Sequence, residues 1–242
     1  MANQNETNYV DNISIKIIRS KRRRTFGIQI TEGDFILRVP SRASPRSIEH
    51  SLNSFTPWIR QKQAILETAE KAPTYTYQFG EQFPWLDTKL ILTSTDKRDM
   101  PKLTNKNLLI HVPSTVHNQI AYKHKRVVQF YKHVGLKHLT ARVNYFADIV
   151  GRRPQDVRIY SYKRRWGSCS SQRVITFNWS ILLAPTSIVD YVVVHELAHL
   201  IHFDHSKSYW QVVERVLPNY RNQQTWLKEN GHLLSITPSH WN

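Results

Sequence analysis

Cysteine and long apolar runs are what this sequence most clearly lacks. Its single cysteine, Cys169, excludes an internal disulfide and fits a reducing compartment. No uninterrupted apolar run approaches the ~20 residues that would span a bilayer, and the polar residues 1–12 contain no apolar signal-peptide core. From these absences we expect a cytoplasmic protein with no membrane contact.

Acidic residues are also scarce, with 18 Asp and Glu against 34 Lys and Arg and a formal net charge of +16. A field of that sign favours nucleic acid or another polyanion as a partner. The same charge would equally keep a soluble protein monomeric. Charge alone therefore leaves both interpretations open and does not give the oligomeric state.

The motif H-E-x-x-H stands within the otherwise apolar residues 191–201. On a helix, His195 and His199 lie one turn apart on one face and can hold a single Zn²⁺ ion. Glu196 then points at a water bound to that ion. A core helix with two incidental histidines would leave ionisable groups unpartnered among apolar side chains, which costs several kcal/mol. The motif therefore predicts a zinc site with Glu196 as its catalytic residue.

A catalytic zinc needs a third protein ligand, and His202, Asp204 and His205 follow closely. A straight helix carries His202 about 4.5 Å beyond His199 along its axis, too far for zinc–nitrogen bonds of about 2.1 Å. His205 lies where a new helix begins, with Ser206 as its N-cap, so it follows a reversal of the chain. We expect His205 to be the third ligand, and Asp204 could orient an imidazole.

The N-terminal part of the chain shows strand-like alternation. Residues 13–40 predict a β-meander, in which Arg19–Arg24 forms a turn that is either solvated or in contact with phosphate groups. Ser44 followed by proline predicts the start of a long helix, which Pro57 should kink or split. This part of the protein is therefore expected to be β-rich and basic, with one long helix.

The expected domain boundary lies at Pro113, where a proline–serine pair separates two kinds of pattern. It divides the chain into a β-rich basic N-terminal region, residues 1–112, and a second domain, residues 113–242. Apolar periodicity predicts a helix over about residues 115–150. Two strands are then expected, at residues 157–162 and 174–179.

Several motifs in this order and spacing resemble the YgjP-like metallopeptidase family, a bacterial zincin group related to the SprT/Spartan proteases. They are Lys163–Cys169 (K-R-R-W-G-S-C), Ile175–Trp179, Asp190–Leu200 and His205–Trp210. In the N-terminal half, Arg19–Thr25 resembles the basic hairpin of that family. The resemblance therefore extends over nearly the whole chain.

The resemblance implies an α+β fold, in which a zincin-like metallopeptidase domain follows the β-rich region. It implies Glu196 as the catalytic residue and the following zinc ligands: His195, His199 and His205. Tyr209 departs from the family pattern, which usually has phenylalanine there, but it lies outside the implied metal site.

The expected reaction is metal-assisted hydrolysis of peptide bonds, in which Glu196 takes a proton from a zinc-bound water and returns it to the leaving group. Residues 174–179 are the expected edge strand for an extended peptide. Asn178 could hold the substrate backbone, and Arg165 and Tyr209 could stabilise an oxyanion. Each of these three also has an ordinary structural interpretation: a hydrogen bond, a surface ion pair and core packing respectively.

Two other functions use the same residues. One is a metal-dependent nucleotide or phosphoanhydride hydrolase, which the positive charge would suit. The other is a nucleic-acid-binding protein with a structural zinc, although such sites normally have four protein ligands and no need of Glu196. The charge and the SprT/Spartan resemblance also allow a protease that acts on nucleic-acid-associated proteins. The sequence favours the zinc metallopeptidase and leaves its substrate open.

Overall fold

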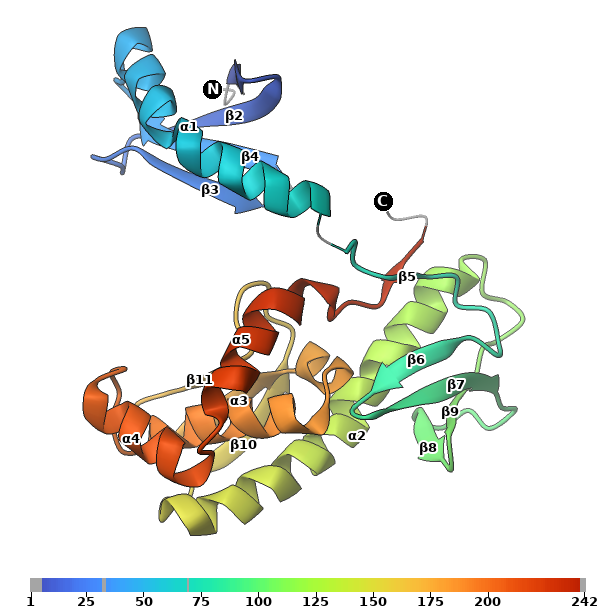
Figure 1. Cartoon of the computed structure of the whole chain (residues 1–242). Helices are drawn as coiled ribbons and strands as arrows, with labels where there is room; N and C mark the ends of the chain where they lie inside the picture. Colours follow the sequence, from blue (N-terminus) through green and yellow to red (C-terminus); the bar gives the residue numbers. More distant parts are fainter. Residues whose placement is uncertain (1–5, 32–33, 69, 240–242) are drawn as a thin grey trace. The chain divides into compact units, whose positions relative to one another are not determined.

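The computed structural model describes residues 6–31, 34–68 and 70–239 (Figure 1). By its internal contacts the chain divides into two compact units, Met1–Glu70 and Lys71–Asn242. Both units contain helix and sheet, which confirms the predicted α+β class. Within the described ranges, no helix has the combination of length and apolar character that crossing a membrane requires.

The first unit is a four-stranded sheet packed against one long helix. Its elements are β1 (Glu6–Val10), β2 (Ile13–Ser20), β3 (Gly27–Thr31), β4 (Asp34–Pro40) and α1 (Pro45–Thr68). The strand order is β1-β2-β4-β3, and only β2 and β4 run parallel to each other. Alternate strand residues, such as Ile15 and Leu37, share a buried core with Leu52 and Ile59 of α1. This confirms the predicted β-rich region with one long helix, and α1 runs through Pro57 without being split.

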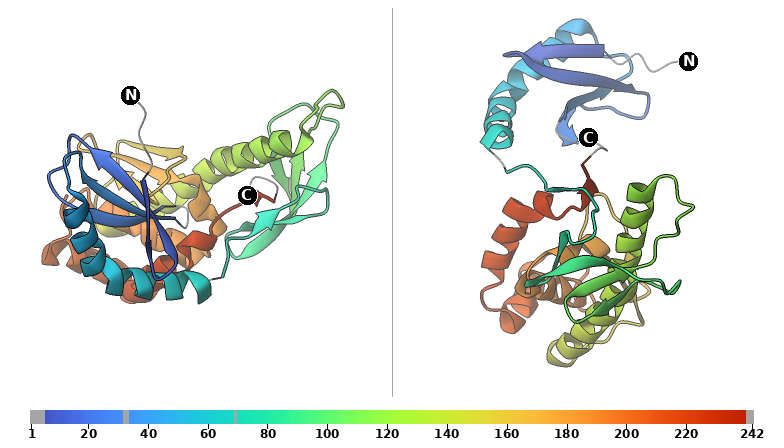
Figure 2. Two further views of the ribbon diagram at one scale, coloured as in Figure 1. Left: turned by 90° about the horizontal axis from the view of Figure 1, so that it is seen from above. Right: turned by 90° about the vertical axis from the view of Figure 1, so that its right-hand side faces the viewer.

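The second unit contains another four-stranded sheet, which shares a core with a long helix. Its elements are β6 (Gln82–Trp85), β7 (Thr88–Ser94), β8 (Lys102–Thr104), β9 (Asn107–Ile110) and α2 (Gln119–Val150). The strand order is β6-β7-β9-β8, and this sheet lies beside the first half of α2 (Figures 1 and 2). Phe83, Leu92 and Ile110 of the strands belong to the same buried core as Phe130 and Tyr131 of α2.

This shared core places the division between the units earlier in the chain than the boundary expected after residue 112. The strands β6 to β9 bury their apolar side chains with those of α2, so they belong to the second unit. Pro113 lies in the connection between β9 and α2. A proline–serine pair signals such a connection, but it does not show which core the preceding strands join.

A small mixed sheet follows α2. It is built from β10 (Asp156–Tyr160), β11 (Gly167–Cys169) and β12 (Val174–Asn178). The strand order is β10-β12-β11, with β10 parallel and β11 antiparallel to β12. The expectation that residues 174–179 form an edge strand is therefore wrong, because β12 is central and β11 lies at the edge.

The remaining helices are η1 (a 3₁₀ helix, Trp179–Leu183), α3 (Thr186–Ala198), α4 (Lys207–Val216), α5 (Tyr220–Asn230) and η2 (a 3₁₀ helix, Gly231–Leu233). Two contacts from distant parts of the chain fix α3. Asp87, between β6 and β7, accepts hydrogen bonds from the backbone N–H (3.1 Å) and the hydroxyl of Thr186 at the start of α3. Arg142 of α2 forms a bidentate ion pair with Asp190 of α3, at 2.7 and 2.8 Å. Near the chain's end, β13 (Thr237–Pro238) pairs in parallel with β5 (Thr74–Tyr75).

Candidate metal centre

The H-E-x-x-H residues lie where α3 ends. His195 is in the last turn of α3, and His199 is the residue directly after it, still with helical backbone angles (φ −66°, ψ −16°). The four-residue spacing therefore keeps its helical geometry, and the two ring centroids lie 5.1 Å apart. The local sequence alone is enough to bring these two imidazoles together.

The reversal of the chain between α3 and α4 brings a third imidazole to the same place. Ser206 caps α4 by accepting a hydrogen bond from the backbone N–H of Tyr209 (3.4 Å). Directly before that cap, Nε2 of His205 lies 3.3 Å from Nε2 of His195. One ring nitrogen from each of His195, His199 and His205 lies within 4.8 Å of the others.

This arrangement fits a metal ion. Two nitrogens bound to one tetrahedral zinc at about 2.1 Å are themselves about 3.4 Å apart, close to the 3.3 Å between His195 and His205. Burial, and then the two neighbouring histidines, lowers the pKa of His195 to about 3, so its ring is neutral, as a metal ligand must be. Three imidazoles leave one tetrahedral position for water or substrate, the usual pattern of a catalytic zinc site.

The ring of His199 is oriented by the backbone. Its Nδ1 lies 3.1 Å from the carbonyl oxygen of His202, a contact that leaves Nε2 for the histidine group. The carboxylate of Asp204 instead accepts a hydrogen bond from the N–H of Ser206 (3.4 Å). The orienting contact expected of Asp204 is thus made by the backbone of His202. Among the described residues, the side chains of His202 and Asp204 do not belong to the group of three histidines.

Glu196 is buried beside these histidines, with only 4% of its surface exposed. Burial raises the pKa of its carboxyl to about 8, and the positive charge of Arg165 opposes that rise. Within the described part of the chain, Oε2 of Glu196 has no hydrogen-bond partner. An unpaired, largely buried carboxyl with a raised pKa is a group suited to proton transfer near neutral pH.

Gly167 of β11 provides the space for this carboxyl. A Cβ added at residue 167 would lie 2.5 Å from Oε1 of Glu196, which is closer than real Cβ contacts allow. No role for Gly167 is predicted from the sequence. A glycine inside a strand sequence is a sign of close approach by another group, and that signal could have found it.

Asn178, at the end of β12, contacts the backbone of Arg165, which lies just before β11. The buried amide of Asn178 donates to the backbone oxygens of Tyr162 (3.0 Å) and Arg165 (3.3 Å). It therefore holds the loop between β10 and β11, which matches the structural interpretation of this residue. The guanidinium of Arg165 is exposed and lies over the ring of Tyr162, 5.2 Å from its centroid.

Tyr209 packs against the rings of the three histidines. It is fully buried, and its hydroxyl donates to the backbone oxygen of His195 (3.0 Å). Its ring centroid lies 4.7 Å from that of His199 and 4.8 Å from that of His205. Cys169 is nearby but is not part of the histidine group, and burial raises the pKa of its thiol to about 11.

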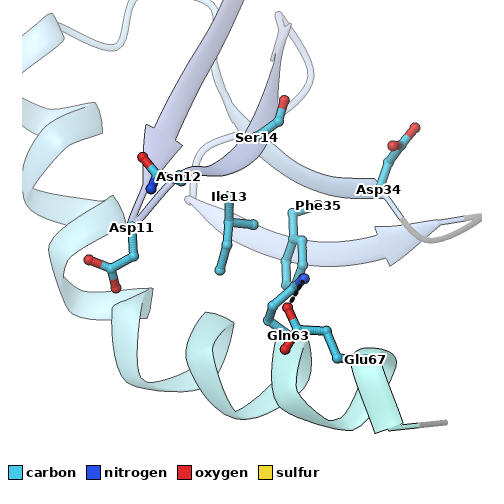
Figure 3. Close-up of a pocket in the computed structure, with 8 residues that line it drawn as sticks. All are labelled: Asp11, Asn12, Ile13, Ser14, Asp34, Phe35, Gln63 and Glu67. Atoms are coloured by element: carbon cyan, nitrogen blue, oxygen red, sulfur yellow. Dashed lines mark hydrogen bonds between the residues drawn. The ribbon is translucent and has the colours of Figure 1, made fainter.

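A separate cavity of about 370 Å³ belongs to the first unit (Figure 3). Its three carboxylates already have partners in the first unit: Asp34 pairs with Lys16 and Asp11 pairs with Arg60, each at 2.5 Å, and Glu67 accepts a hydrogen bond from the amide of Gln63 (2.8 Å). The cavity has no residue in common with the three-histidine group.

Three converging imidazoles beside a buried carboxyl, on an α+β fold, form the arrangement that metal-dependent hydrolases use. The chain belongs to the YgjP-like metallopeptidase family, whose domain model matches residues 24–230. Among solved structures, the chain is similar to the crystal structure of the metallopeptidase zymogen of Pyrococcus abyssi abylysin, with 27% sequence identity and a TM-score of 0.36. That match covers 41% of this chain and 98% of the other. No curated protein is significantly similar to this chain.

Proposed function

We propose that this protein is a zinc-dependent peptidase in which His195, His199 and His205 hold the ion and Glu196 is the catalytic base. One observation carries the proposal: the Nε2 atoms of His195 and His205 lie 3.3 Å apart, as ligands of one ion do, beside the buried Glu196. Membership of a metallopeptidase family supports peptide bonds as the target.

The chain's own residues supply proton transfer and positioning. Bound zinc would act as a Lewis acid and lower the pKa of a bound water. Glu196 would accept a proton from the attacking water at Oε2, the oxygen without a partner among the described residues, and pass it to the leaving amine. The backbone oxygen of His202 holds the ring of His199. An extended substrate would pair with the free side of β11, the edge strand next to Glu196.

The two other functions are less well supported. A structural zinc normally has four protein ligands, whereas the described residues bring together three histidines and a buried, unpaired carboxyl. A phosphoanhydride hydrolase could use the same metal, but the family match favours peptide bonds.

The test is to incubate wild type and Glu196→Gln with denatured protein, with and without DNA, beside a panel of nucleoside triphosphates. We expect wild type to cleave denatured protein, and Glu196→Gln to keep its zinc but lose cleavage. Cleavage confined to triphosphates would exclude the peptidase. Full turnover by Glu196→Gln would exclude the mechanism.

We further propose that the first unit contacts nucleic acid through the turns at one end of its strands. Because β2 and β4 are parallel, the turns that follow them lie at the same end of the sheet. There the backbone N–H of Ser41 donates to the backbone oxygen of Ser20 (3.1 Å). The basic residues of the two turns are Lys21, Arg22, Arg23, Arg24 and Arg42. Asp11 precedes β2 and Asp34 begins β4, so both lie at the opposite end of these strands. Each is paired with a cation.

This separation of charge along the strands suits a phosphate backbone, which binds by releasing counterions. The test is fluorescence anisotropy with labelled duplex and single-stranded DNA over a range of salt concentrations. Replacing Lys21, Arg22 and Arg24 by glutamine should weaken binding about tenfold or more and lower the salt slope by roughly 0.7–0.9 for each lost phosphate contact. Lys62→Gln, on α1, is the matched control. Equal binding by both variants would exclude this surface.

A further inference from the structure

A basic cavity of about 380 Å³ lies beside the edge strand β11 and is separate from the three histidines. One wall is the loop between β10 and β11, and the other comes from the short 3₁₀ helix η2 (Gly231–Leu233). Four basic side chains line it: Lys163, Arg164, Arg165 and His232. No aspartate or glutamate is among its lining residues.

The cavity is held in shape by buried contacts. The amide of Asn178 donates to the backbone oxygens of Tyr162 and Arg165, and the backbone N–H of Asn178 donates to Trp166 (2.7 Å). On the other wall, Gly231 packs so closely on the indole of Trp166 that an added Cβ would lie 3.0 Å from it. The backbone of the loop that carries the cations is therefore fixed at both ends, so this wall of the cavity needs little backbone rearrangement to bind an anion.

The cations of this loop form no ion pair in the part of the chain that the structure describes. Lys163, Arg164 and Arg165 are all exposed. An arginine fork binds a carboxylate through two parallel hydrogen bonds, which makes the pair strong and directional. The cavity is therefore complementary to a carboxylate.

The cavity is also close to the proposed reaction centre. Arg165 is two residues from Gly167, so the Cα atoms of Arg165 and Gly167 are at most about 7.6 Å apart. The backbone of Gly167 in turn contacts Glu196. Each residue of an extended peptide spans about 3.4 Å. A substrate paired with β11 would thus reach the cavity within about three residues of the bond to be cleaved. The effect of the Arg165 charge on Glu196 agrees with this short separation.

We propose that this cavity is a substrate subsite that binds a carboxylate, either an Asp or Glu side chain or a free C-terminal carboxylate, within a few residues of the cleaved bond. The inference rests on the proposed peptidase function and adds a substrate preference to it. The protein then prefers peptides with negative charge at one position relative to the scissile bond.

The binding test uses the Glu196→Gln protein, so that peptides are not consumed. Labelled peptides of one length and sequence would carry a single Glu at successive positions, or none, with the C-terminus either free or amidated. We expect one Glu position, or the free C-terminus, to bind about tenfold more tightly than the neutral amidated peptide. The two arms distinguish a side-chain carboxylate from a terminal one.

The double change Lys163→Gln, Arg164→Gln should remove this gain, while Lys97→Gln, an exposed cation that does not line the cavity, should leave it intact. Arg165 is kept because it also acts on Glu196. Equal affinities for charged and neutral peptides would overturn the proposal. So would a gain that survives the double change, or one that Lys97→Gln removes equally.

Cleavage of the same peptides by the wild-type protein tests the carboxylate subsite and the peptidase function separately. Cleavage with no preference for the carboxylate peptides would overturn the subsite and leave the peptidase standing. A carboxylate gain that depends on Lys163 and Arg164, without cleavage of any peptide, would support the binding site and overturn the proposed function.

Discussion

The backbone of Gly167 lies directly against the carboxyl of Glu196, so closely that a Cβ at residue 167 would be 2.5 Å from Oε1. The edge strand β11 therefore acts as one wall of the space that Glu196 occupies. The three atoms that such a Cβ would meet first are all in the Glu196 side chain. A methyl group at residue 167 would have to displace the proposed catalytic base.

This contact predicts that Gly167→Ala impairs hydrolysis and leaves metal binding intact. Misplacing a catalytic group by about 1 Å can cost on the order of 100-fold in rate, and we expect a loss of tenfold or more in kcat. Steady-state cleavage and zinc content would be measured on the same preparation. Ser171→Ala, in the exposed turn after β11, is the control. An unimpaired Gly167→Ala protein would show that Glu196 need not keep this position.

Zinc content should separate His205 from His202, although both follow α3 closely. His205→Ala removes a ring nitrogen from the group of three, so most of the metal should be lost. In His202→Ala the backbone oxygen that holds His199 remains, so the zinc content should stay near that of wild type. Elemental analysis of both purified variants is the measurement. Loss of metal from His202→Ala alone would reverse the assignment of the third ligand.

Tyr209→Phe should lower stability more than catalysis. The change leaves the part-buried backbone oxygen of His195 without its hydroxyl donor, at a cost of about 0.5–1.5 kcal/mol. For a chain of this size that corresponds to roughly 2–4 °C in Tm for each kcal/mol. We expect kcat per bound zinc to remain within about threefold of wild type. A large fall in kcat at unchanged Tm would instead assign the hydroxyl to oxyanion stabilisation.

The pKa of Glu196 predicts a pH-dependent effect of Glu196→Gln on the metal-free protein. Folding raises this pKa from its ordinary 4.5 to about 8, so between these values the folded state binds more protons than the unfolded state. Glu196 therefore destabilises the fold increasingly as pH rises through this window, by up to about 1.4 kcal/mol per pH unit. Glutamine has no such penalty.

Thermal unfolding in EDTA at pH 5 and pH 8 measures this effect. The Tm of Glu196→Gln should exceed that of wild type, and the difference should be larger at pH 8. A difference that is equal at both pH values, or larger at pH 5, would contradict the raised pKa.

The sequence by itself determined the features that depend on local geometry. A four-residue spacing on a helix brings His195 and His199 together, and the capping serine before α4 marks the reversal that returns His205 to them. Alternating apolar residues likewise predicted the β-rich first unit and its long helix. That these histidines bind zinc stays a prediction.

Only the tertiary structure decided what depends on contacts between distant segments. Strand order makes β11 rather than β12 the edge strand, and a shared core assigns β6 to β9 to the second unit. The chain also brings Asp87 to the start of α3 and Gly167 to Glu196. Periodicity shows which face of a segment is buried, but not which other segment buries it, because that pairing depends on the packing of the whole unit.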